Sequence, residues 1–147
     1  MIDRHLVYLA QTDTTAGLLS ANFQKLNQAK TRDINKPILM EVNSLKNLKN
    51  LTRVPNKFKN KIRKSLKSTF IYPNKNSFRV VKDELHLRFL NHFGQMYSTS
   101  ANKTGVAFRY VEAFNMCDVL IIDKRGISST SSSSIFKINN ARIKKIR

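Results

Sequence analysis

The chain has 147 residues, a single cysteine and a formal net charge of +18. This length suits one ordinary domain with its own core and excludes two full domains. With 41% hydrophobic residues, four glycines and three prolines, the composition excludes a disordered chain. Cys117 has no partner for an internal disulfide, and the apolar run near the N-terminus is too short for a signal peptide or a membrane span. We therefore expect a soluble cytoplasmic protein.

The charge is unevenly distributed, with 27 basic against nine acidic residues. No acidic residue occurs between Glu41 and Asp83, and a second acid-free stretch runs from Lys124 to Arg147. Such a surface attracts polyanions. Two interpretations stay open: a solvated lysine-rich face without a partner, or a surface that contacts RNA phosphates without reading their sequence.

Apolar runs and helical spacing alternate along the first third of the chain. Residues 6–10 predict a short buried strand, which a polar turn at residues 11–14 ends. Ser20 or Asn22 is suited to cap the helix that follows. Residues 37–42 then have the length and apolar character of a second strand.

The middle of the chain continues this alternation. Residues 44–51 predict a helix, and Pro55 is suited to the first turn of a basic helix that carries Phe58, Ile62 and Leu66 inward. Strands are expected at residues 69–72 and 78–81, on either side of the Pro73-Asn74 turn.

Residues 83–93 have the pattern of a helix with Gly94 as its stop signal. The remaining expected elements are a strand at residues 96–99, a helix at 108–116, and strands at 119–123, 135–138 and 143–146. This order predicts a single α/β or α+β domain, residues 1–147, with one twisted, mixed, largely parallel sheet flanked by helices.

Three polar features adjoin these elements. Lys30 and Arg32 flank one residue at the end of the first helix, so an extended backbone would direct both cations to one side. They fit either a carboxylate or phosphate site, or ordinary surface charge at a helix end. Thr12, Asp13 and Thr14 form a turn whose hydroxyls and amides fit either a small polar ligand or ordinary turn chemistry.

Arg79 lies in an otherwise apolar strand, where a buried cation requires an anionic partner. It is expected either to bind a substrate carboxylate or to lie on an open, solvated face. The three histidines are scattered and predict packing or surface roles rather than a metal site. Gly-rich phosphate loops and paired carboxylates at helical spacing are absent from the sequence.

Five motifs in this order resemble the YrdC-like family, which includes YciO and the threonylcarbamoyl-AMP synthases. They are Thr12-Asp13-Thr14, Lys30-Thr31-Arg32, Phe78-Arg79-Val80, Ser98-Thr99-Ser100-Ala101-Asn102-Lys103-Thr104-Gly105 and Gly126-Ile127-Ser128-Ser129-Thr130. The resemblance implies a YrdC-like fold in a shortened member that lacks the family's usual N-terminal helix.

The resemblance also implies an activity. Such an enzyme, a nucleotidyltransferase, joins L-threonine, bicarbonate and ATP into threonylcarbamoyl-adenylate and pyrophosphate, used to make threonylcarbamoyladenosine in tRNA. Magnesium would bridge the ATP phosphates without a dedicated protein site. The expected site residues are Lys30 and Arg32 for catalysis, Thr12, Thr14, Arg79 and Ser129 for threonine, and Ser100, Asn102 and Arg147 for ATP.

The expected partners beyond these substrates are tRNA or double-stranded RNA and other tRNA-modification proteins, with no membrane. An alternative function remains open. The same fold with the same positive charge could serve as a non-catalytic module that binds double-stranded RNA or tRNA.

Overall fold

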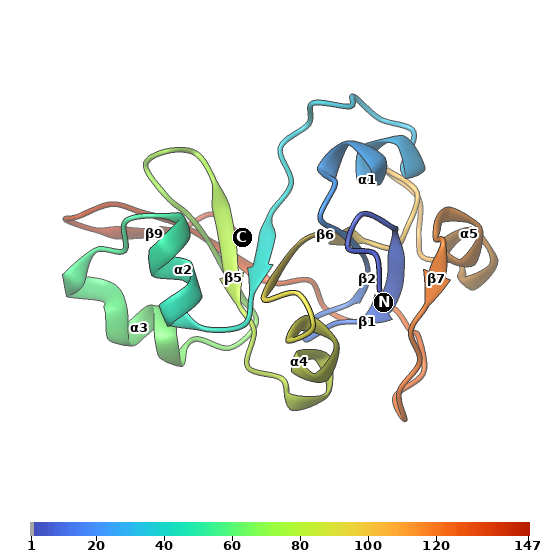
Figure 1. The fold of residues 1–147 in the computed structure, drawn as a ribbon. Helices are drawn as coiled ribbons and strands as arrows, with labels where there is room; N and C mark the ends of the chain where they lie inside the picture. Colours follow the sequence, from blue (N-terminus) through green and yellow to red (C-terminus); the bar gives the residue numbers. More distant parts are fainter. Residues whose placement is uncertain (1) are drawn as a thin grey trace.

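The computed structural model describes residues 2–147, which form one nine-stranded sheet with helices packed on it (Figure 1). The strands are β1 (Tyr8–Gln11), β2 (Ala16–Ser20), β3 (Met40–Val42), β4 (Ser68–Ile71), β5 (Ser77–Val80), β6 (Gln95–Ser100), β7 (Val119–Leu120), β8 (Ser134–Ile138) and β9 (Ile143–Lys145). The helices are α1 (Phe23–Ala29), α2 (Leu45–Leu51), the short 3-10 helix η1 (Asn56–Phe58), α3 (Lys59–Lys64), α4 (Glu84–Leu90) and α5 (Tyr110–Met116).

The sheet order is β7-β1-β2-β6-β3-β5-β4-β8-β9. The single domain with a mixed sheet flanked by helices is confirmed, but the expected predominance of parallel pairs is not found. Only β1–β7, β3–β5 and β4–β8 are parallel, and the other five pairs are antiparallel. The reason is local, because three of the antiparallel pairs join consecutive strands through short turns, which parallel strands cannot use.

Separate apolar cores divide the molecule into two lobes along the sheet. Residues 42–82 and 134–147, here called the distal lobe, pack around Leu48, Ile62 and Phe70. The remaining residues, the proximal lobe, build most of two further clusters, which include Leu26 and Leu90, and Val81 at the end of the first distal segment packs in the second of them. Figure 1 shows α2, α3 and β9 at one end of the molecule, and α1, α5 and β7 at the other.

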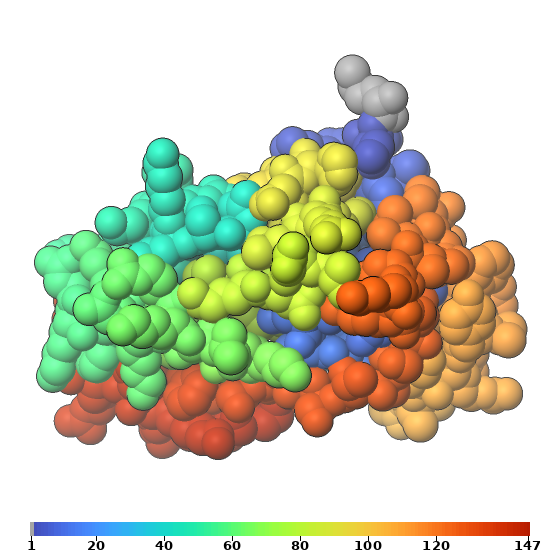
Figure 2. Space-filling model, turned by 90° about the horizontal axis from the view of Figure 1, so that it is seen from below, coloured from blue at the N-terminus to red at the C-terminus, as the bar shows by residue number. Residues whose placement is uncertain are grey.

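The C-terminal segment connects the two lobes. Figure 2 shows residues coloured orange to red passing across the molecule from the proximal to the distal lobe. None of the helices within residues 2–147 combines the length and the apolar character that crossing a membrane requires.

Most expected elements lie where the sequence placed them, with two differences. Asn22 caps α1 as predicted, since its side chain accepts from the amides of Gln24 and Lys25. Strand β2 was not expected, because all five of its residues are buried and give no alternating pattern. The predicted inward position of Leu66 is wrong: α3 ends at Lys64, and Leu66 is 69% exposed.

Candidate functional site

A cavity of about 250 Å³ lies where the two lobes meet, and its polar lining consists of hydroxyl groups and cations. None of the side chains that line it carries a carboxyl group. The hydroxyls belong to Thr12, Thr14, Thr15, Ser98, Thr99, Ser100, Ser132 and Ser133, and the cations to Arg32, Lys36, Arg79 and Arg147. This lining is suited to an anionic ligand that accepts several hydrogen bonds.

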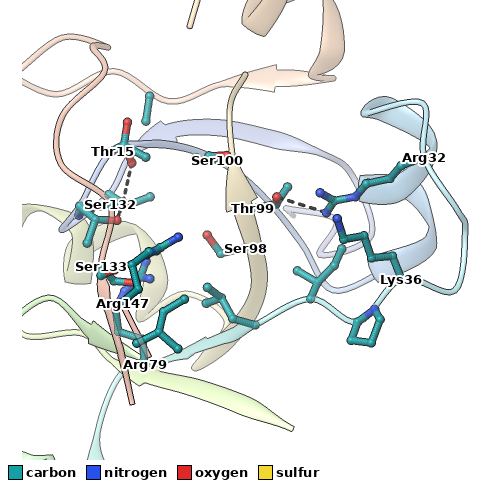
Figure 3. Close-up of a pocket in the computed structure, with 18 residues that line it drawn as sticks. Thr15, Arg32, Lys36, Arg79, Ser98, Thr99, Ser100, Ser132, Ser133 and Arg147 are labelled. Carbon is teal, nitrogen blue, oxygen red and sulfur yellow. Dashed lines mark hydrogen bonds between the residues drawn. The ribbon is translucent and has the colours of Figure 1, made fainter. Parts of the chain in front are cut away.

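The four cations gather at two ends of the cavity. Figure 3 shows Arg79 and Arg147 at one end, beside Ser133, and Arg32 and Lys36 at the other. The hydroxyl groups of β6 lie between the two ends. The arrangement therefore fits an elongated ligand with an anionic group at each end.

Arg79 reaches the cavity because of strand alternation in β5. Its neighbours Phe78 and Val80 point into the distal core, so Arg79 points to the opposite face, where it is only 3% exposed. Its Nε donates to Asp13 Oδ1 at 3.2 Å, and its Nη2 lies 3.5 Å from Glu41 Oε1. The solvated alternative for Arg79 is thus wrong, and its anionic partners are internal.

Glu41 connects Arg79 to a buried histidine. The register of the parallel pair β3–β5 sets Glu41 beside Arg79, and His86 Nε2 from α4 lies 2.6 Å from Glu41 Oε1. Burial disfavours the Glu41 carboxylate, but the charges of His86 and Arg79 outweigh it and lower its pKa to about 2. Burial likewise disfavours the His86 imidazolium, and the Glu41 carboxylate overrides it, so the pKa of His86 is raised. The pKa of Asp13 is raised because burial outweighs Arg79.

Asp13, Glu41 and His86 also offer three ligand atoms within 4.8 Å of one another. Without other charges nearby, three such donor atoms would suit a metal ion. Here the Arg79 guanidinium already lies against both carboxylates, and it would repel a divalent cation. The cluster is therefore better described as the support of Arg79 than as a metal site.

The C-terminal residue completes this end of the cavity. Arg147 Nη2 donates to the Ser133 carbonyl at 2.8 Å, and Ser133 Oγ lies 2.8 Å from Thr69 Oγ1. Thr69 Oγ1 in turn accepts from Arg79 Nη1 at 3.4 Å. Because its hydrogen-bond partner is a neutral carbonyl, Arg147 keeps its charge available, whereas the charge of Arg79 is balanced by carboxylates.

Asn27 organises the other end of the cavity. Its side chain is fully buried on α1, and its Nδ2 donates to the carbonyls of Ile34 and Lys36 at 2.9 and 3.0 Å. Its Oδ1 accepts from Arg32 Nε at 2.7 Å, and Arg32 Nη2 donates to Thr99 Oγ1 at 3.2 Å. One amide thereby positions both the loop that carries Lys36 and the guanidinium of Arg32.

Lys30 lies behind the cavity wall rather than in it. It is 5% exposed, and its Nζ donates to the Ser100 carbonyl at 2.9 Å. Burial, followed by the charges of Arg32 and Lys36, lowers its pKa to about 8. The structure therefore places Lys30 as a cation beneath the turn that follows β6.

The Thr12–Thr15 turn packs tightly against β2. Thr12 Oγ1 donates to the Thr15 carbonyl at 2.6 Å and lies 3.2 Å from Thr14 Oγ1. A Cβ added at Gly17 would lie 2.8 Å from Thr12 Cγ2. Only glycine therefore lets the turn approach β2 this closely.

The predicted site residues separate into two groups. Those that line the cavity are Thr12, Thr14, Arg32, Arg79, Ser100 and Arg147. Those that do not are Lys30, Asn102 and Ser129. The Asn102 amide is engaged with the Lys103 and Val106 carbonyls of its own turn. Ser129 is exposed, because Thr130 binds the Thr14 carbonyl and holds that segment over the threonine turn.

Sequence reasoning missed Asn27, Lys36, Glu41 and His86. Lys36 had a usable signal, a cation beside Pro37 just beyond the Lys30-Thr31-Arg32 motif. The other three act through contacts between segments distant in sequence, which no local pattern reveals. The later serines Ser132 and Ser133 line the cavity where Ser129 was expected.

Comparison with known proteins identifies the fold and family. A family model of Sua5, YciO and YrdC proteins, described as "Telomere recombination", matches residues 2–147. No match was found among curated proteins.

Three solved structures illustrate the likeness. A variant of P. abyssi Sua5 has a TM-score of 0.81 and 14% identity, over 97% of this chain and 52% of that one. P. abyssi Sua5 complexed with L-threonine has a TM-score of 0.76 and 14% identity, over 97% and 50%. E. coli YciO has a TM-score of 0.77 and 16% identity, over 97% and 82%. The chain thus spans about half the length of the two Sua5 chains. Since the family model covers all described residues, the chain belongs to the Sua5/YciO/YrdC family.

Proposed function

We propose that the chain is an L-threonylcarbamoyladenylate synthase, which makes threonylcarbamoyl-adenylate from L-threonine, bicarbonate and ATP for tRNA modification. The observation that carries this proposal is the cavity with cations at both ends, hydroxyl groups between them and no carboxyl group among the side chains that line it. A Sua5 with the same fold has been solved with L-threonine, which supports threonine as a ligand here.

The end with two arginines suits the threonine carboxylate. Arg79 is held rigidly by Asp13 and Glu41, so it can orient a carboxylate without losing much side-chain entropy. Arg147 supplies the uncompensated charge, and the hydroxyls of Thr12 and Thr14 are available to the polar groups of threonine.

The reaction forms two bonds in turn. The threonine amine attacks the carbon of bicarbonate, and water is lost to give a carbamate. A carbamate oxygen then attacks the α-phosphorus of ATP, and pyrophosphate leaves with the electrons of the broken P–O bond. Both steps gather negative charge on oxygens and require no covalent enzyme intermediate.

The second cationic end suits that developing charge. Arg32 and Lys36 line it directly, and Ser100 presents a hydroxyl from the end of β6. Fixed donors of this kind lower a barrier through positioning and electrostatic stabilisation. Magnesium would be held by the ATP phosphates, because the side chains that line the cavity offer no carboxylate ligand for it.

A pyrophosphate-release assay tests the proposal. The purified chain with MgATP, bicarbonate and L-threonine should release pyrophosphate, and omission of threonine or bicarbonate should abolish the release. Arg32→Ala should lower the rate by about a hundredfold or more, as expected for loss of one transition-state donor. Arg88→Ala, at an exposed arginine away from the cavity, is the control and should keep the wild-type rate. Release of pyrophosphate that does not depend on threonine would overturn the proposal.

A further inference from the structure

Arg125, which follows β7, uses every donor of its guanidinium within the protein. Its Nε and Nη2 donate to the two carboxylate oxygens of Asp123 at 3.1 and 2.7 Å, and its Nη1 donates to Asp83 Oδ1 at 3.2 Å. The remaining two donors reach the backbone. Nη2 also donates to the Gln11 carbonyl at 3.1 Å, and Nη1 to the Thr12 carbonyl at 3.2 Å. Five donors thus meet five acceptors, which among side chains requires the planar fork of arginine.

The contact with Gln11 extends the sheet beyond the point where strand pairing stops. Strand β7 pairs with β1 as far as Leu9, whose carbonyl accepts from the Ile121 amide at 2.9 Å. The Gln11 carbonyl lies two residues further along the same side of β1, but β7 ends at Leu120. The guanidinium of Arg125 therefore takes the place of the next backbone donor.

The segment that follows Arg125 lies along the threonine turn. The Ser128 amide donates to Gln11 Oε1 at 2.9 Å, and the Ser128 carbonyl accepts from the Ala16 amide at 3.2 Å. Residues 125–130 thus contact the turn at both of its ends, and Arg125 is the only charged residue among them.

Arg79 holds the same turn from a second side. Asp13, in the middle of the turn, accepts from Arg79 Nε at 3.2 Å. Arg125 is linked to this support, because Asp83 Oδ1 also accepts from the His86 amide at 2.9 Å and so caps α4. Arg79 therefore fixes a side chain of the turn, and Arg125 fixes its backbone.

The backbone of the turn determines where two hydroxyl groups of the cavity lie. Thr12 and Thr14 line the cavity, whereas Arg125 does not. Thr12 Oγ1 accepts from the Thr14 amide at 3.1 Å, so the position of this hydroxyl follows the backbone directly. Arg125 can therefore act on a ligand in the cavity through the turn.

We propose that Arg125 is a positioning residue for L-threonine. By fixing the two carbonyls, it presents the hydroxyls of Thr12 and Thr14 to the substrate. The identity of the ligand rests on the proposed function, whereas the placement of the turn does not. Threonine binds at this end of the cavity, while negative charge develops at the other cationic end. Loss of Arg125 should therefore weaken threonine binding without slowing the chemical step.

Two substitutions of Arg125 test the proposal in the pyrophosphate-release assay. Arg125→Ala removes all five donors. Arg125→Lys keeps the charge but has three donors, which the carboxylates of Asp83 and Asp123 attract away from the carbonyls. Both variants should raise the threonine KM about tenfold or more, with kcat and the KM for ATP within about threefold of wild type. Arg88→Ala, at an exposed arginine that pairs with Glu84, is the control and should leave all three constants unchanged.

Hydrogen–deuterium exchange measures the turn itself, without substrate. Amides in residues 11–17 should exchange about tenfold or more faster in both Arg125 variants than in wild type or Arg88→Ala, because the turn opens more often without its backbone contacts. Exchange in α2, which belongs to the distal core, should stay unchanged. Circular dichroism establishes that each variant is folded.

A wild-type threonine KM in Arg125→Lys would overturn the proposal, because charge alone would then suffice. So would a fall in kcat at an unchanged threonine KM, or exchange that is either unchanged in residues 11–17 or faster throughout the chain. If the wild-type protein releases no pyrophosphate, the proposed function fails, and exchange in residues 11–17 still decides whether Arg125 fixes the turn.

Discussion

At the scale of single residues, Glu41 determines how the arginine end of the cavity is built. It is fully buried on β3 and shares its carboxylate between Arg79 and His86. Removal of one partner of a buried ion pair leaves an uncompensated charge, which costs more than the pair itself contributes. Glu41 therefore ties the stability of the fold to the position of Arg79.

Glu41→Gln should lower the free energy of unfolding by about 3 kcal/mol, since Arg79 and His86 lose their shared carboxylate. Urea denaturation at pH 6 measures the change. Glu84→Gln, at an exposed partner of Arg88, is the matched control and should change stability by less than about 0.5 kcal/mol. Equal stability of the two variants would contradict the role assigned to Glu41.

The Glu41–His86 pair makes the stability of the fold depend on pH. Because the pKa of Glu41 is lowered from 4.5, its contribution is complete above pH 4.5 and is lost as the pH falls toward 2. Because the pKa of His86 is raised from 6.5, its contribution is complete below pH 6.5 and is lost as the pH rises through the raised value. The stability difference between wild type and Glu41→Gln should therefore be largest between pH 4.5 and 6.5. A difference that grows steadily above pH 7 would contradict this assignment.

Gly17 sets the position of the threonine turn. Gly17→Ala places a methyl group 2.8 Å from Thr12 Cγ2, so Thr12 or the turn that carries it must shift. The variant should bind L-threonine at least about tenfold more weakly and lose about 1–3 kcal/mol of stability through overpacking. Calorimetric titration and urea denaturation measure the two effects, and unchanged threonine affinity would contradict the close packing.

At the scale of elements, the junction of α1 with the following loop positions the second cationic end. Asn27→Ala removes the amide that binds Arg32 Nε and two loop carbonyls. The rate of pyrophosphate release should fall by about tenfold or more, with a stability loss of about 1–3 kcal/mol. Asn47→Ala is the control, because Asn47 also binds a backbone carbonyl, that of Gly94, but away from the cavity. It should reduce stability without reducing the rate at saturating substrate.

The helices and most strands were predictable because their signals are local. The Asn22 cap and the helical spacing from residue 45 to 51 lie within single elements, and Gly94, with a φ of 81°, ends the turn that follows α4, which itself ends at Leu90 rather than at residue 93.

Strand β2 escaped prediction because its two faces are buried by different clusters, Leu18 with Leu26 of α1 and Leu19 with Leu90 of α4, which lie far from it in sequence or on another element. Whether two strands pair in parallel or antiparallel likewise depends on the path of the chain between them. Hydrophobic periodicity carries no information about that path.

The site was predictable in part for the same reason. The threonine turn, Arg32, Arg79 and Ser100 belong to motifs visible in the sequence, Arg147 was expected from the family resemblance alone, and the structure gathers all of them around one cavity. The residues that hold these side chains in place come from distant parts of the sequence. His86 and Glu41 are 45 positions apart, and Arg79 and Asp13 are 66 apart. Such contacts arise from sheet register and helix packing rather than from local sequence pattern.

At the scale of the whole molecule, the two lobes differ in charge and share one cavity. Because the distal lobe contains 17 cations and no acidic residue, repulsion within it should weaken folding at low ionic strength. The unfolding midpoint should rise between 20 mM and 300 mM sodium chloride as salt screens this repulsion. The rise should be smaller in the variant that combines Lys46→Gln, Lys49→Gln and Lys64→Gln. An unfolding midpoint that falls as salt is added would show that repulsion within the distal lobe is not the dominant electrostatic effect on stability.

The proposed reaction joins threonine, the carbon of bicarbonate and AMP in the cavity between the lobes. Mass spectrometry of a reaction with carbon-13 bicarbonate, L-threonine and MgATP detects its product. Wild-type protein and Arg88→Ala should form an adenylate that contains both threonine and the labelled carbon, whereas Arg32→Ala should not. Failure of the folded wild-type protein to form this adenylate, or its equal formation by Arg32→Ala, would rule out the proposed reaction in this cavity.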